Sequence, residues 1–412
     1  MKKVCRNTTL LLFCWAVFAP AMAVASANAS EADSFASCIE VLKQQARSEG
    51  VSPAVVDAVL NKVNYVERVI ELDRSQPEFT RTFAQYYLAR VADSRVARGR
   101  EMLAANQPLL NKVYWATGVP PRYLVAFWGL ETNFGSYIGK MSVPSSLATL
   151  ACDKRRSTFF TEQLMTVLQI VDQGDVEAEQ LVGSWAGAMG QMQFMPTTFE
   201  RYAVDADGDG HRNLWVSVPD AMMSAGQFLA ALGWVPGLRW GREVRLPEGF
   251  DYSRIGLDKR LPLSDWAAAG VRDANGQLLP SVSLSAAILL PGGARGPAFV
   301  VYENFDVIMG WNRSEFYAIA VGRLADRVIG AGELWRPPVD DGVELSVDLI
   351  RQLQKNLNTL GFEGGEEDGI FGAQSRTALR SFQVQQGLLA DGYPTTELIE
   401  TVSRAARNSD ND

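Results

Sequence analysis

Glu131 has the sequence surroundings of an acid–base catalyst. It stands in PPRYLVAFWGLETNFG, residues 120–135, where apolar residues recur at helical spacing. Two prolines suit the first turn of a helix, and Gly135 is placed to end it. Burial beside Trp128 and Phe134 would raise the pKa of the carboxyl, so it could hold a proton near neutral pH and give it to a leaving group. The alternative is a surface acid at a helix end, which is the commoner case for a glutamate.

The acidic loop DADGDGHRN, residues 205–213, predicts a calcium site. Its acids and its second glycine repeat the spacing that begins an EF-hand loop, where alternate side chains and one carbonyl converge on a hard cation. Position 12 of such a loop is Val216, which cannot supply the usual acid, so Asp220 would serve in a longer loop. A metal-free acidic turn is the alternative. The candidate ligands are Asp205, Asp207, Asp209, the carbonyl of His211, and Asp220.

The glycine-rich stretch GSWAGAMGQMQFMP, residues 183–196, would let the backbone approach a ligand closely. A tight packing loop between helices is an equally good interpretation of its composition. Its polar members, which could grip hydroxyl and amide groups, are Ser184, Gln191 and Gln193. Its candidates for an aromatic or apolar sugar platform are Trp185, Phe194 and Met195.

Several classes of function are excluded by what the chain lacks. It has one histidine, His211, so Ser-His-Asp catalysis, Cys-His catalysis and multi-histidine metal sites are ruled out. No glycine motif for a nucleotide phosphate is present, and we expect no organic cofactor. The formal charge of -8 argues against nucleic acid as a partner and fits a neutral or amphoteric polymer better.

The elements that must position these residues are mostly helices, so the fold class is mainly α (α+β). From 234 to 297 short apolar runs, many Gly and Pro, and alternation over 282–290 predict a small β-containing insertion. WRPPVDDG, residues 335–342, indicates a linker to a separate three-helix module. Helices are expected over 34–60, 81–103, 107–117, 120–135, 158–172, 176–182, 197–202, 220–232, 317–329, 345–360, 375–385 and 395–406.

The first 29 residues indicate a cleaved secretory signal, with a basic start, an apolar run over 10–17 and small-residue cleavage motifs. We therefore expect a soluble exported protein without a membrane anchor; a retained anchor is the alternative. Cys38 and Cys152 remain after cleavage. In an oxidising compartment this pair predicts one disulfide, with two separate buried thiols as the alternative.

Four motifs together resemble the lytic murein transglycosylase B family, in order and spacing, through most of residues 34–332. They are GLETNFG, GSWAGAMGQMQFMPTTF, DADGDGHRNLW and NFDVIMGWNRSEFYAIAVG. LQKNLNTLGF and DGIFGAQSRTALRSFQ resemble a peptidoglycan-binding domain. The resemblance implies a signal peptide (1–29), a lysozyme-like, multi-lobed catalytic domain (30–334), a linker (335–344) and a three-helix peptidoglycan-binding domain (345–406).

The resemblance also implies an activity. Glu131 would protonate the glycosidic oxygen between MurNAc and GlcNAc in peptidoglycan, then act as base toward the C6 hydroxyl of the same MurNAc. A 1,6-anhydro ring would result without water. The expected location is a Gram-negative periplasm, and the expected partners are glycan strands and other wall proteins. A muramidase that admits water and a non-catalytic wall-binding scaffold are the alternatives.

The family's sites can be carried over to matching positions of this sequence. The acidic loop matches the family's calcium site. Trp311 stands where the family has a tyrosine, so we expect stacking there and no hydroxyl contact. The expected substrate-binding residues are Tyr86, Ser184, Gln193, Phe194, Trp311, Asn312 and Tyr317.

Overall fold

The computed structural model describes residues 21–75, 81–340 and 345–409. The first twenty residues of the expected signal segment therefore lie outside the described residues. In the described ranges, no helix has the length and apolar character needed to cross a bilayer.

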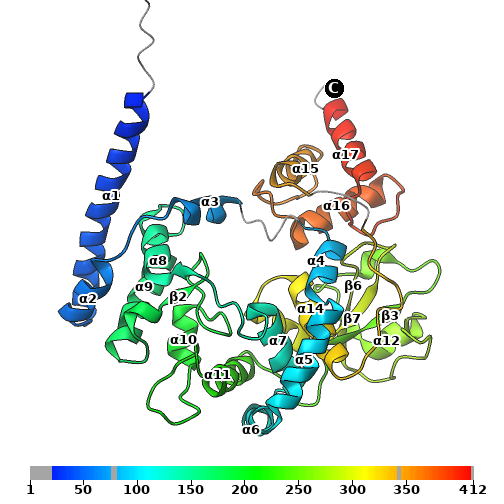
Figure 1. The fold of residues 1–412 in the computed structure, drawn as a ribbon. Helices are drawn as coiled ribbons and strands as arrows, with labels where there is room; N and C mark the ends of the chain where they lie inside the picture. Colours follow the sequence, from blue (N-terminus) through cyan, green and yellow to red (C-terminus); the bar gives the residue numbers. More distant parts are fainter. Residues whose placement is uncertain (1–20, 76–80, 341–344, 410–412) are drawn as a thin grey trace, which may run out of the picture.

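One helical lobe, at the left of Figure 1, is built around α8 and α9, which pack on each other and on helices from both sides of them in the chain. A two-stranded antiparallel pair, β1 with β2, closes it. Its elements are α1 (Ala21–Ser48), α2 (Pro53–Leu60), α3 (Glu67–Ser75), β1 (Met141–Ser142), α8 (Val143–Cys152), α9 (Ser157–Asp172), β2 (Val182–Gly183) and α10 (Pro196–Tyr202).

A second group of helices surrounds α7, which packs against α5, α6, α11 and α14. Residues of α7 from Tyr123 to Leu130 are all buried, so this helix forms the centre of the main core. The helices of this group are α4 (Phe83–Arg90), α5 (Asp93–Ala105), α6 (Gln107–Thr117), α7 (Pro121–Thr132), α11 (Val218–Ala231), α13 (Glu303–Trp311) and α14 (Glu315–Val328).

The predicted β-containing insertion is an antiparallel sheet of five strands in the order β4-β6-β7-β3-β5. Its strands and helix are β3 (Gly241–Arg245), β4 (Leu261–Pro262), α12 (Leu263–Ala268), β5 (Arg272–Asp273), β6 (Ser285–Leu289) and β7 (Ala298–Val301). One face of β6 and β7 joins the main core through Ala287 and Phe299, and the other joins the insertion's own core through Ile288 and Val300. Both faces are covered, so the residues of β6 after Ser285 are all apolar and buried, and the expected alternation is absent there.

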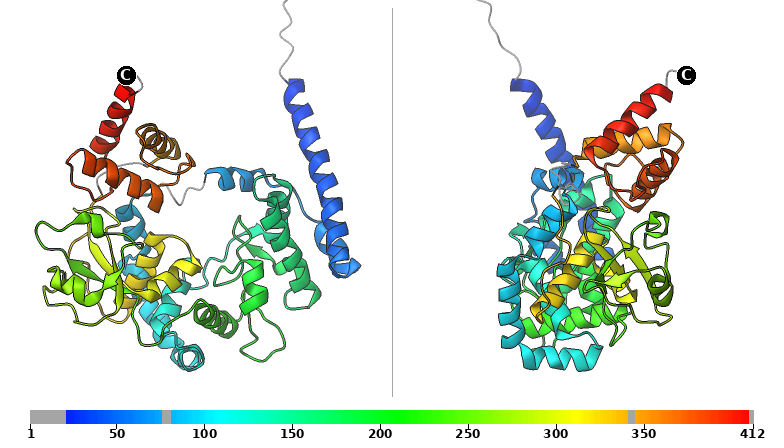
Figure 2. Two further views of the ribbon diagram at one scale, coloured as in Figure 1. Left: turned by 180° about the vertical axis from the view of Figure 1, so that it is seen from behind. Right: turned by 90° about the vertical axis from the view of Figure 1, so that its right-hand side faces the viewer.

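The C-terminal module has three helices and its own core, as the sequence predicted: α15 (Val347–Thr359), α16 (Ala373–Gln385) and α17 (Thr396–Ser409). It lies against the insertion (Figure 2). The Asp391 carboxylate accepts the Ala294 backbone N–H at 2.9 Å, and Arg380 donates to the Ile255 carbonyl at 3.2 Å. These polar contacts set the module on one side of the sheet.

Three expected helices were wrong. The stretch 34–60 is divided between α1 and α2, because Gly50 is left-handed with φ of 93° and Ser52 caps the start of α2. The stretch 81–103 is divided between α4 and α5 because Ala92 is extended, and Arg95 takes up carbonyls at the end of α4, those of Ala89 and Arg90. The stretch 176–182 contains only a 3-10 turn, Ala178–Gln180, because Val182 and Gly183 pair with β1. Periodicity alone cannot anticipate either tertiary contact.

Cys38 of α1 and Cys152 at the end of α8 are joined in a disulfide, 114 residues apart in sequence. We predict that the double variant Cys38→Ser/Cys152→Ser loses up to about 4–5 kcal/mol of unfolding free energy, because the unfolded chain regains the entropy of a long loop. Urea denaturation with and without reductant measures this loss. An unchanged midpoint after reduction would contradict it.

Candidate active site around Glu131

The sequence accounts for where α7 begins but not for where it ends. Pro120 caps the helix in an extended conformation, and Pro121 occupies its first turn. The helix ends at Asn133, before the predicted stop at Gly135. Asn133, Phe134 and Gly135 are successive left-handed residues with φ of 50°, 61° and 75°. Two non-glycine residues in this region mark a strained turn, a feature that clusters at functional sites.

The Thr132 hydroxyl holds this turn in place. It accepts the Gly135 N–H at 3.0 Å and donates to the Gln191 carbonyl at 2.7 Å. Gly129, one turn earlier, leaves room for the Phe134 ring, because a Cβ there would lie 2.7 Å from that ring. The left-handed turn therefore folds back over the helix that carries Glu131.

The Glu131 side chain is partly buried, and two donors meet the same carboxylate oxygen. The Tyr317 phenol at the start of α14 donates to Oε1, and the Trp311 indole N–H at the end of α13 donates to Oε1 at 3.0 Å. No donor from the described residues meets Oε2. The two donors therefore make Oε1 the acceptor and leave Oε2 to carry the acid's proton.

Burial raises the pKa of the Glu131 carboxyl to about 7, against the lowering effect of the Tyr317 and Trp311 hydrogen bonds and of the Arg90 charge. Burial and the adjacent carboxyl hold the pKa of the Tyr317 phenol well above its ordinary value, so the phenol remains a donor. Glu131 is therefore poised to give and take a proton near neutral pH, as the sequence predicted.

An aromatic cluster fixes Trp311. Its ring lies 4.6 Å from that of Phe127, 5.3 Å from Phe194 and 5.1 Å from Phe228, between ring centroids. Phe194 is 2% exposed. Its predicted substrate contact is therefore corrected: Phe194 lies beneath Trp311 and supports it, because a sugar cannot reach a buried ring.

The other predicted substrate residues lie at different depths. Tyr86 is partly buried, and burial raises the pKa of its phenol, with a smaller contribution from the nearby Glu131 charge. The neighbouring Tyr87 is buried. Asn312 is exposed. Tyr317 is buried, with its hydroxyl on the Glu131 carboxyl. Tyr86 is thus the tyrosine of α4 available to a ligand, and Tyr317 acts on the acid itself.

The glycine-rich loop carries Ser184 and Gln193, both partly buried. The Ser184 hydroxyl accepts the Ala188 N–H at 3.0 Å. Gln193, with φ of 49°, donates its amide N–H groups to the carbonyls of Ile138 and Gly190. The loop follows β2 and is held beside the end of α7. Among the described residues, no hydrogen bond joins Ser184 or Gln193 to Glu131 itself.

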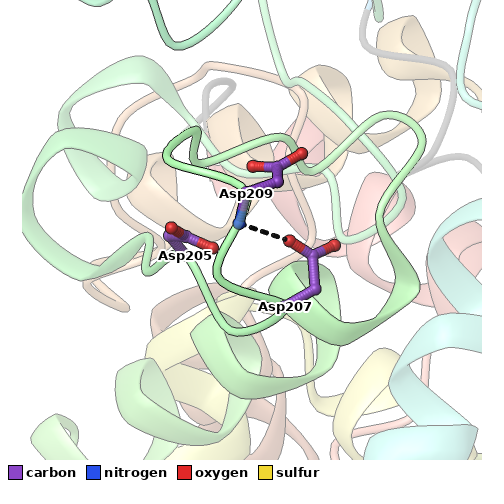
Figure 3. A group of neighbouring side chains, drawn as sticks. All are labelled: Asp205, Asp207 and Asp209. Atoms are coloured by element: carbon purple, nitrogen blue, oxygen red, sulfur yellow. Dashed lines mark hydrogen bonds between the residues drawn. The ribbon is translucent and has the colours of Figure 1, made fainter.

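The acidic loop brings together three of its predicted ligands. Carboxylate oxygens of Asp205, Asp207 and Asp209 lie within 4.8 Å of one another, on exposed side chains (Figure 3). Backbone N–H groups of Gly210 and Gly208 lower the pKa of Asp205. Three hard carboxylate donors this close fit a calcium ion.

Asp220 does not join that cluster. It is fully buried, and its two oxygens accept the N–H groups of Ala206 and Asn213, each at 2.8 Å. Asp220 lies in the first turn of α11, so these two hydrogen bonds attach both ends of the acidic loop to that helix. The Ser217 hydroxyl, which no sequence pattern singles out, faces the cluster instead and donates to Asp207 at 2.6 Å.

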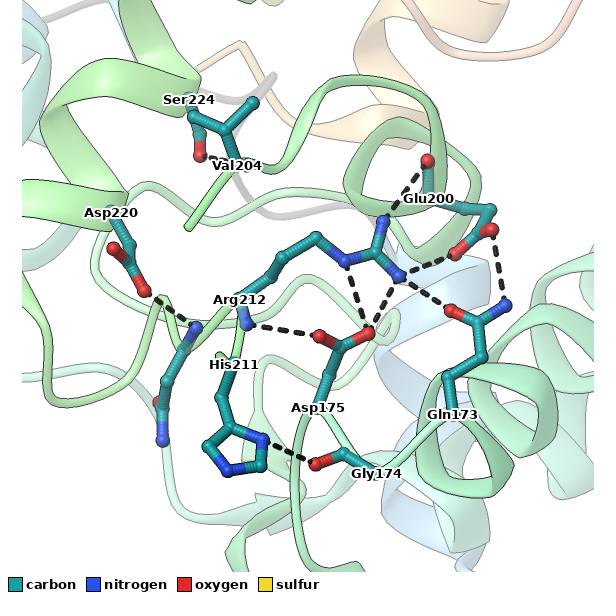
Figure 4. A network of polar contacts seen from close by, with 10 residues as sticks. Gln173, Gly174, Asp175, Glu200, Val204, His211, Arg212, Asp220 and Ser224 are labelled. Atoms are coloured by element: carbon teal, nitrogen blue, oxygen red, sulfur yellow. Dashed lines mark hydrogen bonds and ion pairs between the residues drawn. The ribbon is translucent and has the colours of Figure 1, made fainter. Parts of the chain in front are cut away.

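An ion-pair network that the sequence reasoning missed anchors the same loop (Figure 4). Arg212 donates to Asp175 Oδ2 from both Nε (3.0 Å) and Nη2 (2.6 Å), and its backbone N–H donates to Asp175 Oδ1. The guanidinium also contacts Glu200 and Gln173. The Arg-Asp pair is separated by 37 residues, so only the fold reveals it.

Residues 34–326 match the family model described as a transglycosylase SLT domain, and residues 346–401 match a putative peptidoglycan-binding domain. Over 225 residues the chain is 36% identical to membrane-bound lytic murein transglycosylase B of Escherichia coli. That alignment covers 53% of this chain and 60% of the E. coli protein.

Two solved structures share the fold. SltB3 of Pseudomonas aeruginosa, in complex with NAG-anhNAM-pentapeptide, is 44% identical with a TM-score of 0.86; the match covers 89% of this chain and 99% of SltB3. Lytic transglycosylase Slt35 of E. coli, in complex with calcium, is 28% identical with a TM-score of 0.61; the match covers 71% of this chain and 92% of Slt35.

The raised pKa of Glu131 makes a prediction about stability. Between pH 4.5, the ordinary value, and about 7 the folded state keeps a proton that the unfolded state releases, so stability falls as pH rises through this window. Glu131→Gln removes the effect. We predict that the variant gains stability over the wild type across this window, by about 3 kcal/mol at most, and that the difference is constant above it.

Denaturant unfolding at several pH values measures this difference. Glu248→Gln at an exposed site is the matched control and should show no such trend. A Glu131→Gln curve parallel to that of the wild type from pH 4.5 to 8 would show that the acid is not perturbed.

Proposed function

The chain belongs to the family of transglycosylase SLT domain proteins, and from this premise we propose that it is a lytic transglycosylase of peptidoglycan. It cleaves the β-1,4 bond between MurNAc and GlcNAc and leaves a 1,6-anhydroMurNAc end. The observation that carries the proposal is a single acid, Glu131, whose pKa lies near 7 and whose Oε1 is fixed by two donors. The complex of SltB3 with an anhydro-sugar ligand supports the product.

The reaction needs one titrating group used twice. Protonated Oε2 of Glu131 gives its proton to the glycosidic oxygen, and the C1–O bond breaks as GlcNAc leaves with a new 4-hydroxyl. The carboxylate then takes the proton of the MurNAc C6 hydroxyl while that oxygen bonds to C1. The acid is restored and no water is consumed. A pKa near the working pH suits a group that must act in both directions.

No acid of the described residues is among the groups that shift the pKa of Glu131, which favours this route over hydrolysis. Most glycosidases place two acids across the bond. Among the described residues, the groups that shift the pKa of Glu131 are Tyr317, Trp311 and Arg90, and none is an acid. Arg90, on α4, is instead suited to stabilise the carboxylate that forms after the first proton transfer.

The proposal includes a location and a partner. We place the protein in the periplasm, exported by a cleaved signal within residues 1–29, with peptidoglycan glycan strands as its substrate. The C-terminal module, which matches a peptidoglycan-binding domain, would hold the enzyme on the wall. Other wall-synthesis or wall-degrading proteins are candidate partners.

A structural calcium ion in the acidic loop is also part of the proposal. Asp205, Asp207 and Asp209 would hold it with the carbonyl of His211, and Asp220 would order the loop through its backbone contacts. The ion would supply no chemistry to the substrate. The calcium complex of Slt35 supports this part of the proposal.

Mass spectrometry of digested peptidoglycan tests the activity. We predict muropeptides lighter by one water than hydrolytic products, and no products from Glu131→Gln, which keeps the shape of the side chain without its proton. The variant should still bind the wall through its module. Products with ordinary reducing ends would identify a muramidase. If the wild type gave no products, the protein would be a binding scaffold. Full activity of Glu131→Gln would show that another residue is the catalyst.

Thermal unfolding with added calcium tests the metal site. A ligand of the native state raises the melting temperature by mass action, so we predict a rise with calcium that chelator reverses. Asp207→Asn combined with Asp209→Asn should abolish the shift. Asp251→Asn, at an exposed acid in the insertion, is the control and should leave it intact. A melting temperature that does not change with calcium would show that the native loop binds no calcium ion.

A further inference from the structure

Gln191 in the glycine-rich loop is 5% exposed, and all its polar groups are engaged. Its backbone N–H donates to the Leu214 carbonyl at 2.8 Å, and its amide N–H donates to the Trp215 carbonyl at 3.4 Å. Its backbone carbonyl accepts the Thr132 hydroxyl at 2.7 Å, and its Oε1 accepts the Trp128 indole N–H at 3.1 Å. A buried amide whose nitrogen and oxygen both have partners favours one arrangement of those partners.

Those partners belong to two segments, and Gln191 lies in a third that is distant from both in sequence. Leu214 and Trp215 follow the acidic loop, Gln191 lies in the glycine-rich loop, and Trp128 and Thr132 flank Glu131 on α7. The fit at the helix end is close, because a Cβ on Gly135 would lie 2.5 Å from the Gln191 Oε1. Gln191 thus joins the segment after the acidic loop to the helix that carries the acid. Its side chain does so at Trp215 and Trp128, and its backbone does so at Leu214 and Thr132.

We infer that Gln191 is a positioning residue for Glu131. Trp311 and Tyr317 hold the carboxyl from α13 and α14. Gln191 accepts hydrogen bonds from the side chains of Trp128 and Thr132, on either side of the acid in the same helix. Gln191 does not contact the carboxyl. It acts through Trp128 and Thr132, which fix where the helix ends and hence where the acid stands. Small displacements of a catalytic group cost large factors in rate. The inference rests on the proposed transglycosylase activity.

Gln191→Leu tests the inference, because it keeps similar bulk and removes both side-chain hydrogen bonds. With soluble glycan chains as substrate, we expect kcat to fall at least ten-fold and KM to stay within two-fold, since Gln191 binds no substrate. The wild type and Glu131→Gln serve as the active and inactive references in this assay. An inactive wild type would refute the proposed function and not the role of Gln191.

Gln163→Leu is the matched control. Gln163 of α9 is 1% exposed, and its Oε1 accepts the N–H and the hydroxyl of Thr197, both at 3.1 Å, next to α10. Gln163→Leu removes a side-chain amide that is as buried and hydrogen-bonded as that of Gln191 but, among the described residues, has no hydrogen bond to the Glu131 turn. We expect a comparable drop in melting temperature, with kcat within two-fold of the wild type.

Trp128→Phe removes the same hydrogen bond from the other side and is the second variant should Gln191→Leu not fold. It should lower kcat about three-fold or more at unchanged KM. The double variant Gln191→Leu/Trp128→Phe should lose no more than Gln191→Leu alone, because the hydrogen bond that Trp128→Phe removes is already absent in Gln191→Leu. Unchanged kcat in both single variants, or an equal loss in Gln163→Leu, would overturn the inference.

Discussion

The structure depends on one constraint: a carboxyl group must be kept partly out of water while staying reachable by a substrate. Desolvation favours the protonated form of Glu131, and the Trp311 and Tyr317 donors favour the ionised form. The balance leaves the pKa near 7. Because both donors meet Oε1, they also select which oxygen carries the proton. Each feature of the proposed reaction follows from these opposed effects.

The remaining architecture keeps that balance fixed. The buried helix α7 supplies the desolvation, and the aromatic cluster of Phe127, Phe194 and Phe228 fixes the Trp311 ring. The left-handed turn after Thr132 is strained and is held by hydrogen bonds from the glycine-rich loop. The acidic loop is pinned in turn by Asp220 and by the Arg212–Asp175 pair. Rigidity at the acid is therefore assembled from segments spread over most of the chain.

Local sequence signals predicted the position of α7, the special character of Glu131 and the three-helix C-terminal module. Capping prolines and apolar spacing located α7, and an acid among apolar residues marked Glu131. The helices of the C-terminal module also followed from periodicity. What the sequence could not show were pairings between distant segments. Asp220 binds backbone groups in place of the predicted metal contact, and Phe194 is buried against Trp311; both depend on neighbours that come together only in the fold. The sequence marks Gln191 as a polar residue of the glycine-rich loop, but it does not predict the residues to which Gln191 bonds.

The most direct test of the account is the protonation state of the Glu131 carboxyl itself. Infrared difference spectra between wild type and Glu131→Gln, recorded across pH, isolate the band of this one protonated carboxyl. We predict that the band persists into the neutral range and disappears with an apparent pKa of about 7. Disappearance near pH 4.5, the ordinary value for glutamate, would show that the fold does not hold the proton and would contradict the account.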